Sequence, residues 1–163
     1  MIFQMSQDIF IKINGIDGES KDAQHLNEID VITWTWEIKQ NSAMFSGSGG
    51  GAGKATVSDL SFIHQFDKAS PNLAKYCFTG QHIDKVTLTM RKAGGAPLEF
   101  SRITMYDVVI TQVTPIVAAE ICRETISLSF STIKHEYILQ NPIGGSAGTV
   151  TAMMYIKQNS TVK

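Results

Sequence analysis

Hydrophobic and polar residues alternate along several segments of the chain, which is the pattern of half-buried β-strands. The clearest alternation covers residues 29–40. Its apolar face carries Ile32, Trp34, Trp36 and Ile38, and its polar face carries Thr33, Thr35, Glu37 and Lys39. The same pattern predicts further strands at residues 8–13, 56–66, 84–92, 98–102, 103–115, 124–139 and 149–158.

Residues 103–115 (ITMYDVVITQVTP) do not alternate strictly, because their apolar positions would fall on both faces of a regular strand. A β-bulge adds one residue to a strand and so returns the apolar side chains to one face. We therefore expect a bulge or a break within this strand.

One short helix is predicted beside the strands. Ser70 is expected as its N-cap and Pro71 as its first helical residue, with the helix ending before Gly80. About eight strands and one helix predict a mainly β fold, a small barrel or sandwich flanked by the helix. No linker or repeat marks a second domain, so residues 1–163 are expected to form a single domain.

Composition narrows the classes of partner. The chain is 43% hydrophobic and 18% charged, as a globular protein is. Its net charge of −1 argues against nucleic-acid binding, and no apolar window is long enough for membrane insertion. The N-terminus has no basic leader of the kind that opens a secretory signal peptide. Two cysteines, Cys77 and Cys122, are too few and too far apart for a disulfide framework or a zinc site.

A glycine-rich stretch, SGSGGGAGKA at residues 46–55, invites comparison with phosphate-binding loops. A Walker A loop would need glycine at Ser48 and a hydroxyl residue at Ala55. Gly47, Gly49 and Ala52 do fit the looser dinucleotide pattern. Both kinds of loop lead into a helix, which receives the phosphate at its N-terminus, whereas here a strand pattern follows. Nucleotide binding is therefore not expected.

No catalytic or metal-binding residues are predicted, and no cofactor. The four histidines lie in separate segments without a paired spacing. Asp59 and Asp67 lie near His64, but turn and strand-edge roles explain them more simply. Trp34 and Trp36 would suit sugar stacking, yet they share an apolar face and are expected to anchor the core.

The polar faces of three predicted strands consist largely of small hydroxyl residues. They are Thr33 and Thr35, Thr87 and Thr89, and Ser127, Ser129 and Ser131. Ordinary exposed strands carry more lysine and glutamate. Two interpretations remain open here: a plain exposed face, or a weakly charged surface that faces a lumen or a partner.

Several motifs together resemble one protein family. They are the Trp-x-Trp strand, GGGAGK (49–54), DLSF (59–62), SPNL (70–73), RKAGG (91–95) and ITMYDVVIT (103–111). Their order and spacing resemble the haemolysin-coregulated protein (Hcp) family, the tube protein of the bacterial type VI secretion system. The resemblance covers nearly the whole chain. It implies a non-enzymatic β-barrel protein that closes into rings of six and stacks into a hollow tube.

About fifteen residues without periodicity separate Lys39 from Ala55, longer than most hairpin connections, so a functional loop is expected. The resemblance identifies it as the extended loop that reaches a neighbouring ring. The candidate stacking residues are Met44, Phe45, Gly49, Gly50, Gly51, Gly53 and Lys54. The resemblance also assigns the face opposite Trp34 and Trp36 to the lumen, with Thr33, Thr35, Glu37, Thr87, Thr89 and Ser129 as candidates.

The expected partners also follow from the resemblance. They are further copies of this chain, a VgrG-like spike protein, the contractile sheath and small effector proteins. The protein would assemble in the bacterial cytoplasm and leave without a signal peptide. Two segments depart from the family pattern: residues 114–124 are apolar and contain Cys122 where many members have glycines, and Met153 or Met154 replaces a frequent tryptophan.

Two alternatives remain beside the tube protein. A prophage tail-tube protein would share the barrel, the ring and the lumen. A monomeric barrel that binds a small ligand would also explain the strands and the tryptophans, but it would need an apolar cavity. An enzyme would need a cluster of groups with perturbed pKa values in a cleft.

Overall fold

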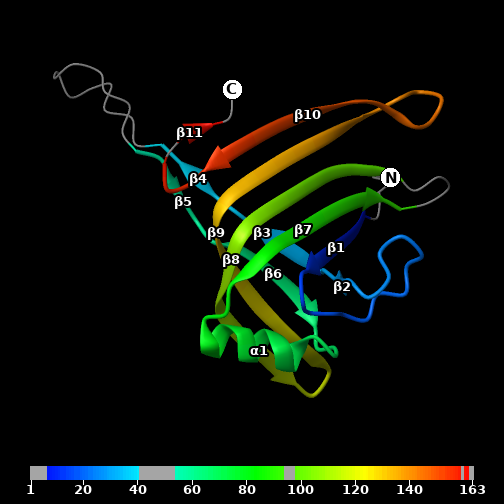
Figure 1. Cartoon of the computed structure of the whole chain (residues 1–163). Coiled ribbons are helices and arrows are strands. Elements are labelled where there is room, and N and C mark those ends of the chain that lie inside the picture. The colour runs from blue at the N-terminus through cyan, green and yellow to red at the C-terminus, as the bar shows by residue number, and fades with distance from the viewer. Residues whose placement is uncertain (1–6, 41–53, 94–97, 159, 162–163) are drawn as a thin grey trace.

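Most of the molecule is β-structure (Figure 1). The computed structural model describes residues 7–40, 54–93, 98–158 and 160–161. The described elements, in chain order, are β1 (Gln7–Ile13), β2 (Ile29–Asp30), β3 (Thr33–Thr35), β4 (Ile38–Lys39), β5 (Thr56–Val57), β6 (Leu60–Gln65), α1 (Ser70–Thr79), β7 (Ile83–Lys92), β8 (Glu99–Ala118), β9 (Ile121–Gln140), β10 (Ser146–Tyr155) and β11 (Ser160–Thr161). The predicted mainly β class with one short helix is confirmed.

The strands form one large antiparallel sheet and one small one. In the large sheet the order is β11-β10-β9-β8-β7-β1-β2, and β3 joins through β6, which pairs with β9. The strands β4 and β5 pair only with each other. Among the described residues the large sheet does not close on itself, so the fold is nearer to an open, folded sheet than to a barrel. The ten-residue helix α1 is too short to span a membrane, and no described helix is long enough.

The long hairpin of β8 and β9 takes part in both layers of the folded sheet. One layer contains β10, β7 and β1, and the other contains β6 and β3. Near its open end it pairs with β7 and β10, and farther along β9 pairs with β6 (Figure 1). The alternation of core-facing and outward-facing residues in β8 changes between these two halves. At this point Asp107 has a φ of 52°, and the register with β9 shifts between Ile110 and Gln112. The predicted bulge is therefore confirmed. The left-handed backbone at Asp107 lies between Met105 and Val108, and both of these side chains, three residues apart, are fully buried.

The core lies between the two layers. It contains the fully buried side chains Phe62, Leu88, Ile103, Leu128 and Ile133 from β6, β7, β8 and β9. Trp34 and Trp36 are half-buried and pack against this core, with Trp36 edge-on to Phe130 at a centroid distance of 6.4 Å.

Residues 29–40 do not form the single strand that their alternation predicts. The segment divides into β2, β3 and β4, because each piece pairs with a different strand. As a result Ile32 and Ile38 are 41% and 44% exposed, although the alternation placed them on the same face as the tryptophans.

The start of α1 also differs from the prediction. Ser70 is the first helical residue and Ala69 the N-cap. Two hydrogen bonds hold the residues just before the helix. The Ala69 N–H donates to Asp67 Oδ1 (2.8 Å), and the Asp67 N–H donates to Ser70 Oγ (3.2 Å). This exchange is similar to a capping box moved one turn ahead. The helix ends as expected at Gly80, whose φ is 66°.

Arg91 fastens the long connection between β1 and β2 to the sheet. Its guanidinium donates to Asp22 Oδ1 (3.0 Å) and Asp8 Oδ2 (3.1 Å), and it lies 5.1 Å from the centre of the Phe10 ring. The hydrogen bond from Arg91 lowers the pKa of Asp22 from 3.8 to about 2. Asp22 is therefore an ionised anchor at any ordinary pH.

Replacing a core leucine of β9 tests the location of the core. Leu128 is fully buried, so Leu128→Ala should lower the free energy of unfolding by about 2–5 kcal/mol. Leu139 lies on the same strand but is 43% exposed, so Leu139→Ala should cost less than about 1 kcal/mol. Urea denaturation of both variants measures the two losses. Equal losses would contradict this assignment of the core.

The Asp22–Arg91 pair predicts a specific acid sensitivity. Because folding lowers the pKa of Asp22, the ion pair stabilises the folded state above pH 3.8 and loses this effect as the pH falls toward about 2. Asp22→Asn should therefore destabilise the protein at neutral pH, and its difference from wild type should shrink over that acidic range. Urea midpoints across the range check this, with the exposed Asp17→Asn as control. A difference that is constant with pH would contradict it.

Candidate functional site

Hydroxyl side chains gather on the face of β7 that points away from the core. Thr87 and Thr89 flank the fully buried Leu88, so both point to the opposite side. Strand register places Thr104 of β8 beside Thr87 and Arg102 beside Thr89. Thr89 and Thr104 are each only 4% exposed. The face is therefore lined at its centre by short hydroxyls and at its margins by longer charged residues.

Several charged residues on this face are paired with one another, whereas Lys12 and Lys85 form no salt bridge among the described residues. Arg102 contacts Glu99 at 2.6 Å and Glu136 at 3.8 Å, and Lys134 also contacts Glu136 at 3.8 Å. His25 is buried between two carboxylates, with Nδ1 2.9 Å from Glu28 and Nε2 3.2 Å from Glu99. These pairs leave little net charge on a surface that is rich in ionic groups.

A shallow cavity of about 260 Å³ opens on the same face. Its lining includes Lys12, Lys85, Thr87 and Thr89, together with the His25 cluster. The alternation of β7 predicts the two threonines on this face, but it does not predict the ionic residues around them. The signal that could have identified them is cross-strand pairing. Arg102 lies opposite Glu136, and this pairing follows only from the register of β8 and β9.

The predicted lumen residues lie in two groups. Thr87 and Thr89 lie on β7, whereas Thr33 and Thr35 lie on β3, with β6, β9 and β8 between the two strands in the sheet. Thr33, Thr35 and the neighbouring Glu37 are exposed, and Ser129 of β9 is half-buried. On the β3 side, Ser61 and Ser127 add a hydroxyl pair at 2.8 Å.

Of the predicted stacking loop, only the base lies within the described residues. Met44, Phe45, Gly49, Gly50, Gly51 and Gly53 lie outside the described residues. Lys54 is exposed just ahead of β5. Because Ile38 pairs with Val57 and Lys39 with Thr56, the chain leaves and re-enters the body at neighbouring points.

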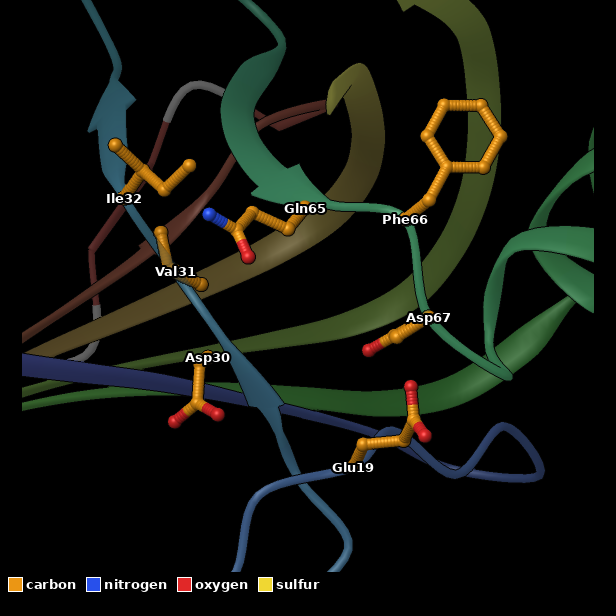
Figure 2. Close-up of a pocket in the computed structure, with 7 residues that line it drawn as sticks. All are labelled: Glu19, Asp30, Val31, Ile32, Gln65, Phe66 and Asp67. Atoms are coloured by element: carbon orange, nitrogen blue, oxygen red, sulfur yellow. The ribbon is translucent and has the colours of Figure 1, made fainter. Parts of the chain in front are cut away.

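A second cavity, of about 350 Å³, carries three carboxylates (Figure 2). Glu19 and Asp67 point toward one another, and Asp30 stands across the cleft beside Val31. Partial loss of hydration raises the pKa of Asp67 and of Asp30, and for Asp30 repulsion from Asp22 and Asp8 adds to the effect. Perturbed acids do occur in a cleft here, which the sequence did not suggest.

The residues behind this cleft do not form a nucleophilic site. His64 is fully buried, with Nε2 2.8 Å from Glu124 and Nδ1 3.9 Å from Asp67. Among the described residues no hydroxyl or thiol is hydrogen-bonded to His64, as an activated nucleophile would be. Nor does the described part of the chain contain a group of three or more histidine, cysteine or acidic residues arranged to hold a metal ion.

Comparison with known proteins gives the family directly. A family model described as "Type VI secretion system effector, Hcp" matches residues 10–137. Protein hcp1 of Pseudomonas aeruginosa is 40% identical over 159 residues, which are 95% of this chain and 98% of that protein.

Solved structures agree. The crystal structure of Hcp1 from Salmonella typhimurium superposes with a TM-score of 0.81 at 46% identity, over 97% of this chain and 100% of that one. A type VI secretion system effector from Yersinia pestis gives a TM-score of 0.77 at 41% identity, over 91% and 99% of the two chains. The chain therefore belongs to the Hcp family, the tube component of the type VI secretion system.

Proposed function

We propose that this protein closes into hexameric rings, which stack into a hollow tube and carry or shield small effector proteins in the lumen. The observation that carries the proposal is the 40% identity to an Hcp protein along 95% of the chain. The superpositions over nearly the full length of two related structures support the proposal, because a shared fold is a condition for a shared assembly. The role is structural, and we propose no catalytic step.

The lumen wall is proposed to consist of the hydroxyl surfaces. Thr33, Thr35, Glu37 and Ser129 would contribute one part, on the side of β3 and β6, and Thr87 and Thr89 another, on β7. The internal pairing of Arg102, Glu99 and Glu136 supports this proposal, because paired charges hold a passing protein less strongly than free ones. Such a wall would let different cargoes move while keeping each weakly bound.

The loop between β4 and β5 is proposed to contact the neighbouring ring. Its two ends lie side by side at the paired strands β4 and β5, as the base of a projecting arm would. Met44 and Phe45 are the proposed apolar anchors, because large apolar side chains dominate the energy of most protein contacts. The glycines that follow would allow close backbone approach.

Contacts with a spike protein, a contractile sheath and small effectors complete the proposal. The protein would leave the cell through the apparatus itself, so export would need no signal peptide.

Sedimentation equilibrium over a range of concentrations tests the assembly. Wild type should have a mass near six protomers and form larger species at high concentration. Phe45→Asp and a variant that lacks the loop should keep the ring and lose the larger species, because they remove only the contact between rings. Leu26→Asp, at an exposed leucine in the β1–β2 connection, serves as the surface control. A wild type that remains monomeric at high concentration would overturn the proposed function.

A further inference from the structure

The hairpin of β8 and β9 continues as a two-stranded extension past its last pairing with β6, near the helix α1, which packs against β8. We call residues 116–122 the distal hairpin. Its strands pair Val117 with Cys122 and Ala118 with Ile121, and the chain turns at Ala119 and Glu120. The neighbouring strand β6 pairs with β9 only as far as Arg123. The distal hairpin therefore has only a limited contact with the rest of the sheet, a backbone hydrogen bond from Phe66 to Cys122.

Both faces of the distal hairpin are apolar. Ile116 is 48% exposed, Val117 67% and Ile121 44%. Ile116 and Val117 are consecutive in a strand, so they point to opposite faces. An isolated two-stranded hairpin is marginally stable in water, and clustered exposed apolar residues usually mark a contact surface. The distal hairpin is therefore suited to insertion into a partner, with both faces covered.

An apolar groove of about 350 Å³ lies at the other end of the molecule. The groove runs between the β4–β5 pair and the end of β10, near β11, whereas the distal hairpin lies beyond α1 (Figure 1). Its apolar lining consists of Ile38, Ala55, Val57, Met154 and Ile156, and its remaining lining of Tyr155, Ser160 and Thr161. Ile38 is 44% exposed within it, so the groove presents apolar surface to solvent.

The charges beside the two surfaces are of opposite sign. The distal hairpin has one ionic residue, Glu120, at its turn. The groove has lysines next to its lining residues in sequence: Lys39 follows Ile38, Lys54 precedes Ala55, and Lys157 follows Ile156. Lys39 is already paired with Glu37 at 3.0 Å. Among the described residues neither Lys54 nor Lys157 forms a salt bridge, although the charge of Lys157 helps to lower the pKa of Asp107, after the larger effect of its hydrogen bond with His82. Lys54 is therefore the freer of the two to receive an incoming carboxylate.

We propose that the distal hairpin of one copy of this chain inserts into the groove of a second copy, with Glu120 directed to Lys54 and Lys157. The two surfaces lie at opposite ends of one molecule, so a single chain cannot join them. A contact between unlike surfaces of identical chains is head-to-tail, and it either closes into a ring or repeats along a filament. The proposal rests on self-assembly as the function, but it does not involve the loop of residues 41–53.

Two variants, one at each surface, test the contact. Val117→Asp disables the distal hairpin and leaves the groove intact, whereas Ile38→Asp does the reverse. Each variant alone should self-associate at least about tenfold more weakly than wild type, since a charge would be buried in an apolar contact. An equimolar mixture should recover one contact for each pair of chains, through the hairpin of Ile38→Asp and the groove of Val117→Asp. Sedimentation velocity and native mass spectrometry measure all three samples.

Ile143→Asp is the matched control, because Ile143 is 92% exposed in the β9–β10 turn and belongs to neither surface. Far-UV circular dichroism verifies that each variant is folded. If Ile38→Asp does not fold, Lys54→Glu with Lys157→Glu replaces it at the rim of the groove. Adding Glu120→Lys to the Lys54→Glu, Lys157→Glu variant should then restore assembly, because the charges at the contact are again of opposite sign.

The outcomes separate this inference from the proposed function. Variants that keep the ring and lose larger species place the contact between rings, and variants that fall to monomers place it within the ring. Full assembly of Val117→Asp, or a mixture that recovers nothing, overturns the hairpin-in-groove contact while the tube proposal stands. A wild type that never associates overturns both. Unchanged assembly of both variants would likewise overturn the contact and would leave the groove without an assigned occupant.

Discussion

The change of phase in the β8–β9 hairpin is the constraint on which the rest of the structure depends. Each strand of this hairpin has twenty residues and serves two layers, so its apolar side chains must face one core along two directions. Two features make this possible: an extra residue, Thr111, where the register shifts between Ile110 and Gln112, and Asp107, whose φ of 52° aspartate tolerates better than most residues. His82 accompanies it, with Nδ1 2.8 Å from the Asp107 carboxylate. The strands β7 and β10 attach to one half, and β6 attaches to the other.

The same hairpin gives the molecule two unlike ends. Its apolar residues continue past the last pairing with β6, while the β4–β5 pair and the end of β10 leave an apolar groove elsewhere. In a monomer both apolar surfaces would stay exposed to water, and exposed apolar surface is unfavourable in free energy. Unlike ends on identical chains favour a head-to-tail contact, which is the kind of contact that the proposed tube would need.

The polar faces combine many ionic groups with little net charge. The carboxylate of Glu99 contacts both His25 and Arg102, and Glu136 contacts both Arg102 and Lys134. Partly exposed pairs of this kind contribute little stability individually. Their effect is on the electrostatic field outside the protein, which they reduce, and a weak field is what the proposed lumen wall would need.

The sequence alone determined the class of fold, the bulge, most strand positions and the family, because alternation and turn residues act locally and the motifs keep their spacing along the chain. It did not determine how residues 29–40 divide, and it placed Ile32 and Ile38 on a buried face. Those positions depend on which strands β2, β3 and β4 pair with, and such partners are distant in sequence. The ionic cluster around His25, the acidic cleft of Asp30 and Asp67, and the distance between the distal hairpin and the groove were likewise decided by tertiary structure. Each joins residues from several strands, and only the register of the folded sheet brings such residues together or sets them apart.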